Sequence, residues 1–321
     1  MESCWGLLGI LTAFDSSLLT AARWPLVGMG FLLFILFNWS RRSSGITLRH
    51  LLGEVSILIP AYFAYFTVRG LAEAREAQAF HRAIDIIELE QTLGIFWEPD
   101  LQSAIMRFDW LVNMANWTYV WGHWPVIVFA ATWLFLLHRD AYSVYRNAFL
   151  ISGAVGLVIF YALPVAPPRF MDAWGFVDTI TERSQAYRVL QPPAFVNQYA
   201  AMPSLHFGWN LLVGIAIFQH SRSIIPKAIG VALPVLMFAS IVLTANHYII
   251  DGLAGGTLAL LGLGGAMLLR DFMERRSEAS ASTLAGQHQL SAAQLDQLRQ
   301  ELARPSFTTI SAFIVSTNKG G

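Results

Sequence analysis

The sequence predicts an all-α integral membrane protein, and composition is the first reason. Of its 321 residues, 55% are hydrophobic and 13% are charged, whereas soluble domains average about 45–50% apolar and about 25% charged residues. The 21 basic residues balance the 21 acidic ones, so no basic excess indicates nucleic acid as a partner. The single cysteine, Cys4, excludes an internal disulfide and a cysteine-based zinc site.

The second reason is a series of apolar stretches long enough to cross a bilayer. A hydrocarbon core about 30 Å thick needs about 20 apolar residues in a helix. Residues 1–23 precede these stretches and are also apolar, but Asp15 interrupts them. They do not begin with the basic residues of a signal peptide, so we expect them to form an interfacial segment. Seven spans are expected: Trp24–Trp39, Leu51–Leu71, Leu111–Leu137, Ala148–Pro164, Ser204–Gln219, Pro226–Ala245 and Ile249–Leu269.

Three further segments are too polar to cross. Residues 73–109 carry charges at helical spacing and predict amphipathic surface helices. Residues 165–203 are rich in proline and predict a long loop, a type of segment that is often functional. Residues 271–321 predict a polar, mostly flexible tail, so 24–270 is expected to form one transmembrane domain.

Basic residues near the span ends predict the orientation. If the spans alternate, one set of short loops collects a dense group of arginines and a lysine, and that side is expected to be cytoplasmic. The C-terminus then lies inside and the two long segments lie outside. The short loops favour a bacterial plasma membrane over a eukaryotic Golgi membrane. The basic side holds Arg41, Arg42, Arg49, Arg139, Arg146, Arg222, Lys227, Arg270, Arg275 and Arg276.

Polar residues gather at the outer ends of three spans. Arg169 follows a pair of prolines, Ser204 and His206 lie in the stretch MPSLH, and His247 precedes Asp251 by four residues. Alternation of the spans brings all three segments to one membrane face. Ionisable residues at spans are costly and usually functional.

His247 and Asp251 share a helix face because they are four residues apart. A carboxylate there can orient one imidazole nitrogen and leave the other free as a nucleophile or base. The structural alternative is a histidine and an aspartate that only cap the turn. His206 would lie one turn into its helix, close enough to donate a proton to a leaving oxygen, or it is an interfacial histidine.

The same face offers groups that bind phosphate. Ser204 is a good N-cap, and the free amides behind it attract anions. Arg169 is a candidate clamp, since guanidinium pairs with phosphate in a bidentate manner, although a snorkelling arginine is the alternative. His123 and Tyr119 are assigned to an aromatic belt. No metal motif is present, so we expect no metal and no cofactor.

Together these motifs resemble the type 2 phosphatidic acid phosphatase superfamily, over roughly Ala148–Leu269. The stretches PPR, PSLH followed by Phe207, and HYIIDGLAGG are most similar to the inositol phosphorylceramide synthase (aureobasidin-resistance) branch. The resemblance implies a six-helix phosphatase-type bundle, so about one span is extra. It also implies a metal-independent phosphohistidine mechanism, in which His247 is the nucleophile, Asp251 holds its ring and His206 is the general acid and base.

The departures from this pattern favour transfer over hydrolysis. The superfamily's phosphatases carry an arginine six residues before the nucleophile, where this chain has Ile241, and no lysine lies on the outer face. A phosphodiester needs fewer cations than a monoester. We therefore expect transfer of a phospho-headgroup, such as phosphoinositol, from a phospholipid donor to a lipid alcohol. The alternatives are hydrolysis of phosphatidate or polyprenyl phosphates, a lipid transporter and a catalytically inactive scaffold.

Overall fold

The computed structural model describes residues 53–59, 61, 75–183 and 198–288. Across these ranges the chain is helical, and the β-structure they contain is one isolated parallel bridge between Val165 and Ala200. This confirms the all-α class. The expected interfacial segment 1–23, the span at 24–39, most of the span at 51–71 and the tail beyond 288 lie outside the described residues.

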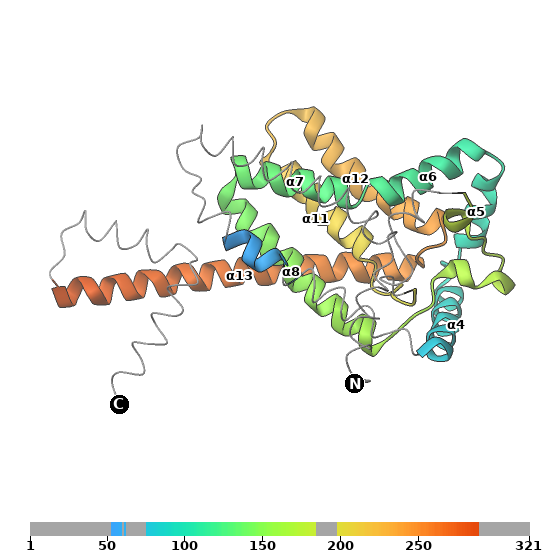
Figure 1. The fold of residues 1–321 in the computed structure, drawn as a ribbon, viewed down its shortest axis with the longest axis horizontal. Coiled ribbons are helices and arrows are strands. Elements are labelled where there is room, and N and C mark those ends of the chain that lie inside the picture. The colour runs from blue at the N-terminus through green and yellow to red at the C-terminus, as the bar shows by residue number, and fades with distance from the viewer. Residues whose placement is uncertain (1–52, 60, 62–74, 184–197, 289–321) are drawn as a thin grey trace, which may run out of the picture.

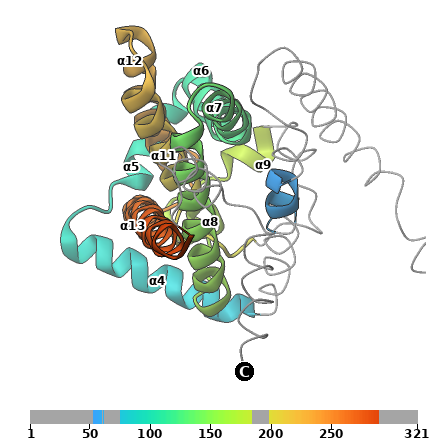
Figure 2. The same cartoon turned by 90° about the vertical axis from the view of Figure 1, so that its left-hand side faces the viewer.

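Six helices form the bundle of the described chain. In Figure 1, α13 runs horizontally, α8 crosses it, and α11 lies between α13 and the layer formed by α6 and α7. Figure 2 looks along α13 and shows α8 and α11 beside it. The bounds are α6 (Asp109–Trp121), α7 (Trp124–Leu137), α8 (Arg139–Ala162), α11 (Leu205–His220), α12 (Ile224–Leu243) and α13 (Ile249–His288).

Three of these helices are long and apolar enough to cross a membrane by themselves. They are α8, α12 and the part of α13 from Ile249 to Arg276. The pair α6 and α7 passes the same test together, which makes up to four candidate spans among the described residues. The protein is therefore a multi-pass membrane protein, while the full expected number of spans stays a prediction.

The stretch expected as one span, Leu111–Leu137, is divided into α6 and α7, which are bent by 46°. The break falls at Gly122 and His123, directly before α7, which has Pro125 in its first turn. Proline has no amide hydrogen and its ring clashes with the carbonyl four residues earlier, so it begins a helix well but interrupts one. The bend turns His123 toward the interior, where it is 4% exposed.

The core lies where α8, α11 and α13 cross. Leu205, Trp209 and Leu212 of α11 pack there against Ala148 of α8 and Ala259 of α13. A Cβ added to Gly208 would lie 2.4 Å from the carbonyl oxygen of Gly255. The backbones of α11 and α13 therefore approach more closely than any larger side chain allows.

The segment expected as surface helices forms α4 (Glu76–Leu93) and α5 (Glu98–Met106). One face of α4 is fully buried through Ala79, Ala83 and Ile87, and the helix packs beside the first turns of α13. The loop after α8 contains short helices, namely η2 (Pro168–Phe170), η3 (Asp172–Trp174) and α9 (Thr179–Arg183). At the other end, α13 continues as a helix past residue 270 to His288.

Candidate active site

Backbone hydrogen bonds bring the three polar segments together at one end of the bundle. The amide of Arg169 donates to the carbonyl of Ala245 at 2.8 Å. The amide of Ser204 donates to the carbonyl of Asp251 at 2.9 Å. Segments separated by tens of residues thus form one cluster, as the alternation of spans predicts.

His247 lies on a tight turn between α12 and α13. The amides of Asn246 and His247 both donate to the carbonyl of Ile241 at 3.1 Å. Ala245 has a φ of 52°, a left-handed conformation that costs a residue with a Cβ about 1–2 kcal/mol. Such conformations persist only where the surroundings impose them, and they cluster at functional sites.

The imidazole of His247 is held mainly by a backbone carbonyl. Its Nδ1 lies 2.7 Å from the carbonyl oxygen of Ala201 and 3.6 Å from Oδ2 of Asp251. A carbonyl oxygen can only accept, so Nδ1 carries a hydrogen, and in the neutral ring the lone pair then lies on Nε2. Sequence reasoning expected Asp251 to orient this ring, and it did not identify Ala201.

Asp251 is fully buried and has a second task in the turn. Its Oδ2 accepts a hydrogen bond from the amide of Tyr248 at 3.0 Å, so the carboxylate closes the turn that leads into α13. Burial, together with the carboxylates of Asp251, Glu90 and Glu98, raises the pKa of Tyr248 above its ordinary value. The Tyr248 hydroxyl is therefore neutral at physiological pH.

His206 lies in the first turn of α11, within a stack of rings. Its ring centroid is 5.8 Å from that of His247, 4.2 Å from that of His123 and 4.5 Å from that of Tyr119. Tyr119 and His123 are buried, so their assignment to an interfacial belt is corrected here. The apolar neighbours of both residues in the sequence concealed this role.

Asn210 ties this stack to α11. Its side-chain nitrogen lies 3.3 Å from Nδ1 of His123 and donates to the carbonyl of His206 at 3.0 Å. Asn210 falls one turn after His206, so the spacing of four residues was the available signal. Together, Tyr119, His123 and Asn210 position His206. Tyr119 comes from α6 and Asn210 from α11.

Ser204 is the N-cap residue of α11, but its side chain makes no capping hydrogen bond. Its Oγ is buried and has no hydrogen-bond partner among the described residues. A buried polar group without a partner costs about 1–3 kcal/mol. The hydroxyl therefore remains available for an oxygen of a bound phosphate, whereas the Ser204 amide is occupied by Asp251.

Arg169 is nine-tenths buried and contacts protein groups. Its Nη1 donates to Oδ1 of Asn246, the residue before His247. Its Nε lies 3.8 Å from Oδ2 of Asp178, and its guanidinium lies over the ring of Phe170. Burial among these partners is incompatible with a freely snorkelling side chain.

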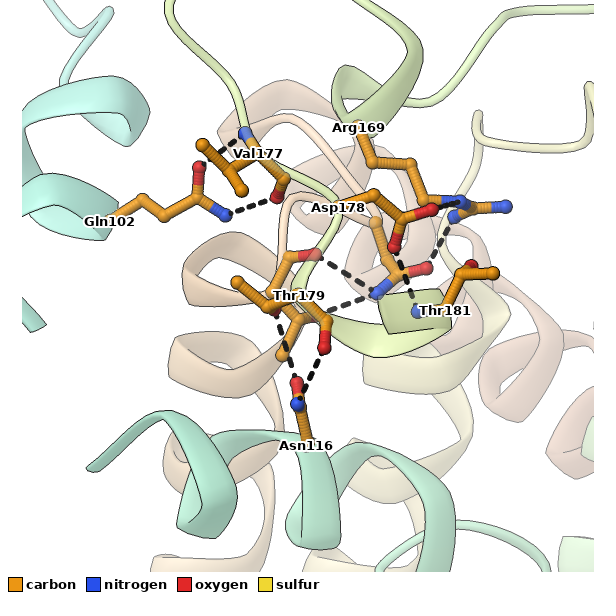
Figure 3. Close-up of polar contacts among 9 residues, drawn as sticks. Gln102, Asn116, Arg169, Val177, Asp178, Thr179 and Thr181 are labelled. Carbon is orange, nitrogen blue, oxygen red and sulfur yellow. Dashed lines mark hydrogen bonds and ion pairs between the residues drawn. The ribbon is translucent and has the colours of Figure 1, made fainter. Parts of the chain in front are cut away.

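The side-chain amides of Gln102 and Asn116 bind the segment that carries Asp178 on both sides of that residue, as Figure 3 shows. Gln102 of α5 both accepts from the amide and donates to the carbonyl of Val177 at 2.9 Å. Asn116 of α6 donates to the carbonyl of Thr179 at 3.0 Å. Asp178, between these two residues, is held beside Arg169, and it also accepts from the amide of Thr181.

The described residues contain no group of three or more histidine, cysteine, aspartate or glutamate side chains placed to hold a metal ion. Metal independence of the reaction stays a prediction. Two carboxyl groups lie next to the site without joining such a group. Glu98 accepts from the amide of Ile249 at 2.9 Å, and Glu90 accepts from the amide of Ile250 at 2.8 Å.

The helical membrane fold and the cluster of two histidines, a buried aspartate and a buried arginine define a membrane-embedded protein suited to phosphoester chemistry. A family model described as the PAP2 superfamily matches residues 84–264, more than half of the chain. The chain belongs to the PAP2 superfamily. Its members are generally phosphatases, so this is a phosphatase-type lipid phosphoesterase or phosphotransferase. The comparisons with curated proteins and with solved structures give no match.

Proposed function

We propose that this chain is a membrane lipid phosphotransferase that moves a phospho-headgroup between lipids through a phosphohistidine. The observation that carries the proposal is the contact between Nδ1 of His247 and the carbonyl of Ala201 at 2.7 Å. In the neutral ring this contact favours the tautomer with the hydrogen on Nδ1 and the lone pair on Nε2, which is what a nucleophile requires. Asp251 and His206 complete the catalytic group, and no metal or other cofactor takes part.

In the first half of the reaction, the Nε2 lone pair attacks the lipid phosphorus. The bond between phosphorus and the leaving lipid oxygen breaks, and His206 gives its proton to that oxygen. The Nδ1 hydrogen stays on His247, where Ala201 and Asp251 stabilise the positive charge that develops on the ring. Arg169 and the Ser204 hydroxyl would bind the phosphate oxygens.

In the second half, the neutral His206 takes the proton of an acceptor hydroxyl. The acceptor oxygen attacks phosphorus, the bond between phosphorus and nitrogen breaks, and its electron pair returns to Nε2 of His247. A lipid alcohol as acceptor gives transfer, and water gives hydrolysis. The centroids of the two rings are 5.8 Å apart, so the two histidines lie close enough to act on the same phosphorus atom.

The charges of the site favour a phosphodiester donor. Ile241 is fully buried at the position where the phosphatases carry arginine, so it supplies no charge. Arg169, the cation next to the turn of His247, is partly neutralised by Asp178. A diester carries one negative charge and a monoester about two, so such a site suits the diester. This supports an activity like that of inositol phosphorylceramide synthase, with a phospholipid donor and a lipid-alcohol acceptor such as ceramide or diacylglycerol.

The orientation belongs to the same proposal. We place the catalytic cluster on the extracytoplasmic face of a bacterial plasma membrane and the C-terminus inside, because the basic loops of the sequence cluster at the opposite ends of the spans. Hydrolysis of phosphatidate or polyprenyl phosphates is the alternative activity.

The test is incubation of the purified protein with phosphorus-labelled phosphatidylinositol, phosphatidate or polyprenyl phosphate, with and without ceramide or diacylglycerol. Transfer of label to the acceptor lipid is expected, together with acid-labile label on the protein. His247→Ala should lose the protein-bound label, and His206→Ala should retain it. Rapid release of free phosphate from phosphatidate without any acceptor lipid would overturn the preference for transfer.

A further inference from the structure

Two glutamates from the N-terminal helices reach the start of the helix that follows His247. Glu90 comes from α4 and Glu98 from α5, and both are 0% exposed. Their Oε1 atoms accept the amides of Ile250 and Ile249, at 2.8 and 2.9 Å. These amides belong to the first turn of α13, where no backbone partner exists within the helix.

The second oxygen of each carboxyl group, Oε2, bears on the protonation of the pair. Oε2 of Glu90 and Oε2 of Glu98 are buried and accept no hydrogen bond from any other described residue. Their Oε1 atoms bind the amides of two consecutive residues, so the two carboxyl groups lie close together, and, after burial, a hydrogen bond to Glu98 contributes to the raised pKa of Glu90. Two carboxylate oxygens are both acceptors, so that bond requires one proton between them.

We propose that Glu90 and Glu98 share one proton and act as a positioning pair that holds the first turn of α13, and with it His247 and Asp251, in the reactive geometry. This inference rests on the proposed function of His247 as nucleophile. A short series of contacts connects the two glutamates to the catalytic cluster. Ile249 follows Tyr248, whose amide binds Asp251, and the Asp251 carbonyl binds the Ser204 amide at the start of α11.

The charge around the pair explains why a proton stays there. The ionisable groups that face Glu90 are Glu98 on α5, Asp251 on α13 and Tyr248 before α13, and all of them are acids. Burial first, then the bond and the charge of Glu98, raise the pKa of Glu90 to about 9. One negative charge on the pair suits the positive end of the helix dipole, whereas two charges beside Asp251 would repel each other.

The first experiment compares substitutions by activity. Glu90→Gln keeps an acceptor oxygen for the Ile250 amide and supplies a donor to Glu98, so kcat at neutral pH should stay within about 3-fold of the native value. Glu90→Leu removes the acceptor and should lower kcat about 10-fold to 100-fold with little change in KM. Glu88→Leu, an exposed glutamate on the same helix, is the matched control and should change neither. Equal kcat values for the two leucine variants would overturn the positioning role.

The second experiment does not depend on the reaction. The infrared carbonyl band of a protonated carboxylic acid should be present in the native protein at neutral pH and should be lost in Glu90→Gln. Exchange of the Ile249 and Ile250 amides should be slow in the native protein and in Glu90→Gln and faster in Glu90→Leu. A native protein without the band would overturn the shared proton. A native protein with the band and slow exchange, but with no label on His247, would contradict only the proposed function.

Discussion

Replacing Gly255 by alanine tests whether the crossing of α11 and α13 sets the geometry of the site. Gly255 lies one turn after Asp251, and a Cβ there would be 2.0 Å from the carbonyl oxygen of Ser204 and 2.7 Å from its carbonyl carbon. These are backbone atoms, which cannot rotate away as a side chain does.

The magnitude follows from the contact distance. Ordinary contact begins at 3.4 Å, so the two helices must separate by 3.4 − 2.0 = 1.4 Å at this point. His206 is carried by α11, and His247 precedes α13, so they separate with the helices. A misplacement of about 1 Å costs on the order of 100-fold in rate. Overpacking of this kind also destabilises by about 1–3 kcal/mol.

The assay is transfer of labelled headgroup at matched concentrations of folded protein, with folding followed by thermal unfolding in detergent. Gly264→Ala is the control, because it lies on the same helix and a Cβ there meets nothing within 4 Å. We expect the Gly255→Ala variant to lose about 100-fold in kcat and the control to lose none. If both variants keep native kcat, the close crossing does not set the distance between the two histidines.

Three further perturbations follow from the described contacts. The raised pKa of Glu90 means that the free energy of unfolding of the native protein falls as pH rises from 4.5 to about 9, and Glu90→Gln should abolish this pH dependence. The unfolding temperature of this variant should therefore increase relative to that of the native protein as pH rises from 4.5 to about 9. A constant difference between the two temperatures would contradict this expectation. Asp178→Asn should raise monoester hydrolysis relative to diester transfer by about 10-fold, with exposed Asp172→Asn as control. Tyr119→Ala should lower kcat by up to about 10-fold through loss of the stack on His206, while Tyr119→Phe should keep it.

The membrane class and the meeting of the three polar segments could be predicted from the sequence. Hydropathy is a sum over many residues, so it tolerates local exceptions, and the parity of the spans assigns each segment to a face. The same reasoning could not locate the break in the third expected span. Two helices bent by 46° at Pro125 have the same mean hydropathy as one straight helix.

The positions of the individual contacts could not be predicted. Ala201 holds the ring of His247 through its carbonyl, which any residue carries, so no side-chain pattern marks it. Tyr119 and His123 contact His206 across the bundle, and the apolar residues around both in the sequence give no sign of that contact. The segment 73–109 has the composition of a surface helix, since charged residues recur along it and its buried positions include Glu90, Glu98 and Gln102.

The distribution of charge links the positioning of the nucleophile to the choice of substrate. Among the described residues at this end of the bundle, Arg169 is paired with Asp178, Asp251 faces His247, and Glu90 and Glu98 retain one negative charge. Negative charge beside His247 stabilises the positive charge that develops on its ring as Nε2 attacks phosphorus. The same charge opposes a dianionic monoester more than a monoanionic diester. A site arranged in this way therefore stabilises the phosphohistidine and selects diesters through one electrostatic feature, and neutralising Asp178 should weaken the preference for diesters.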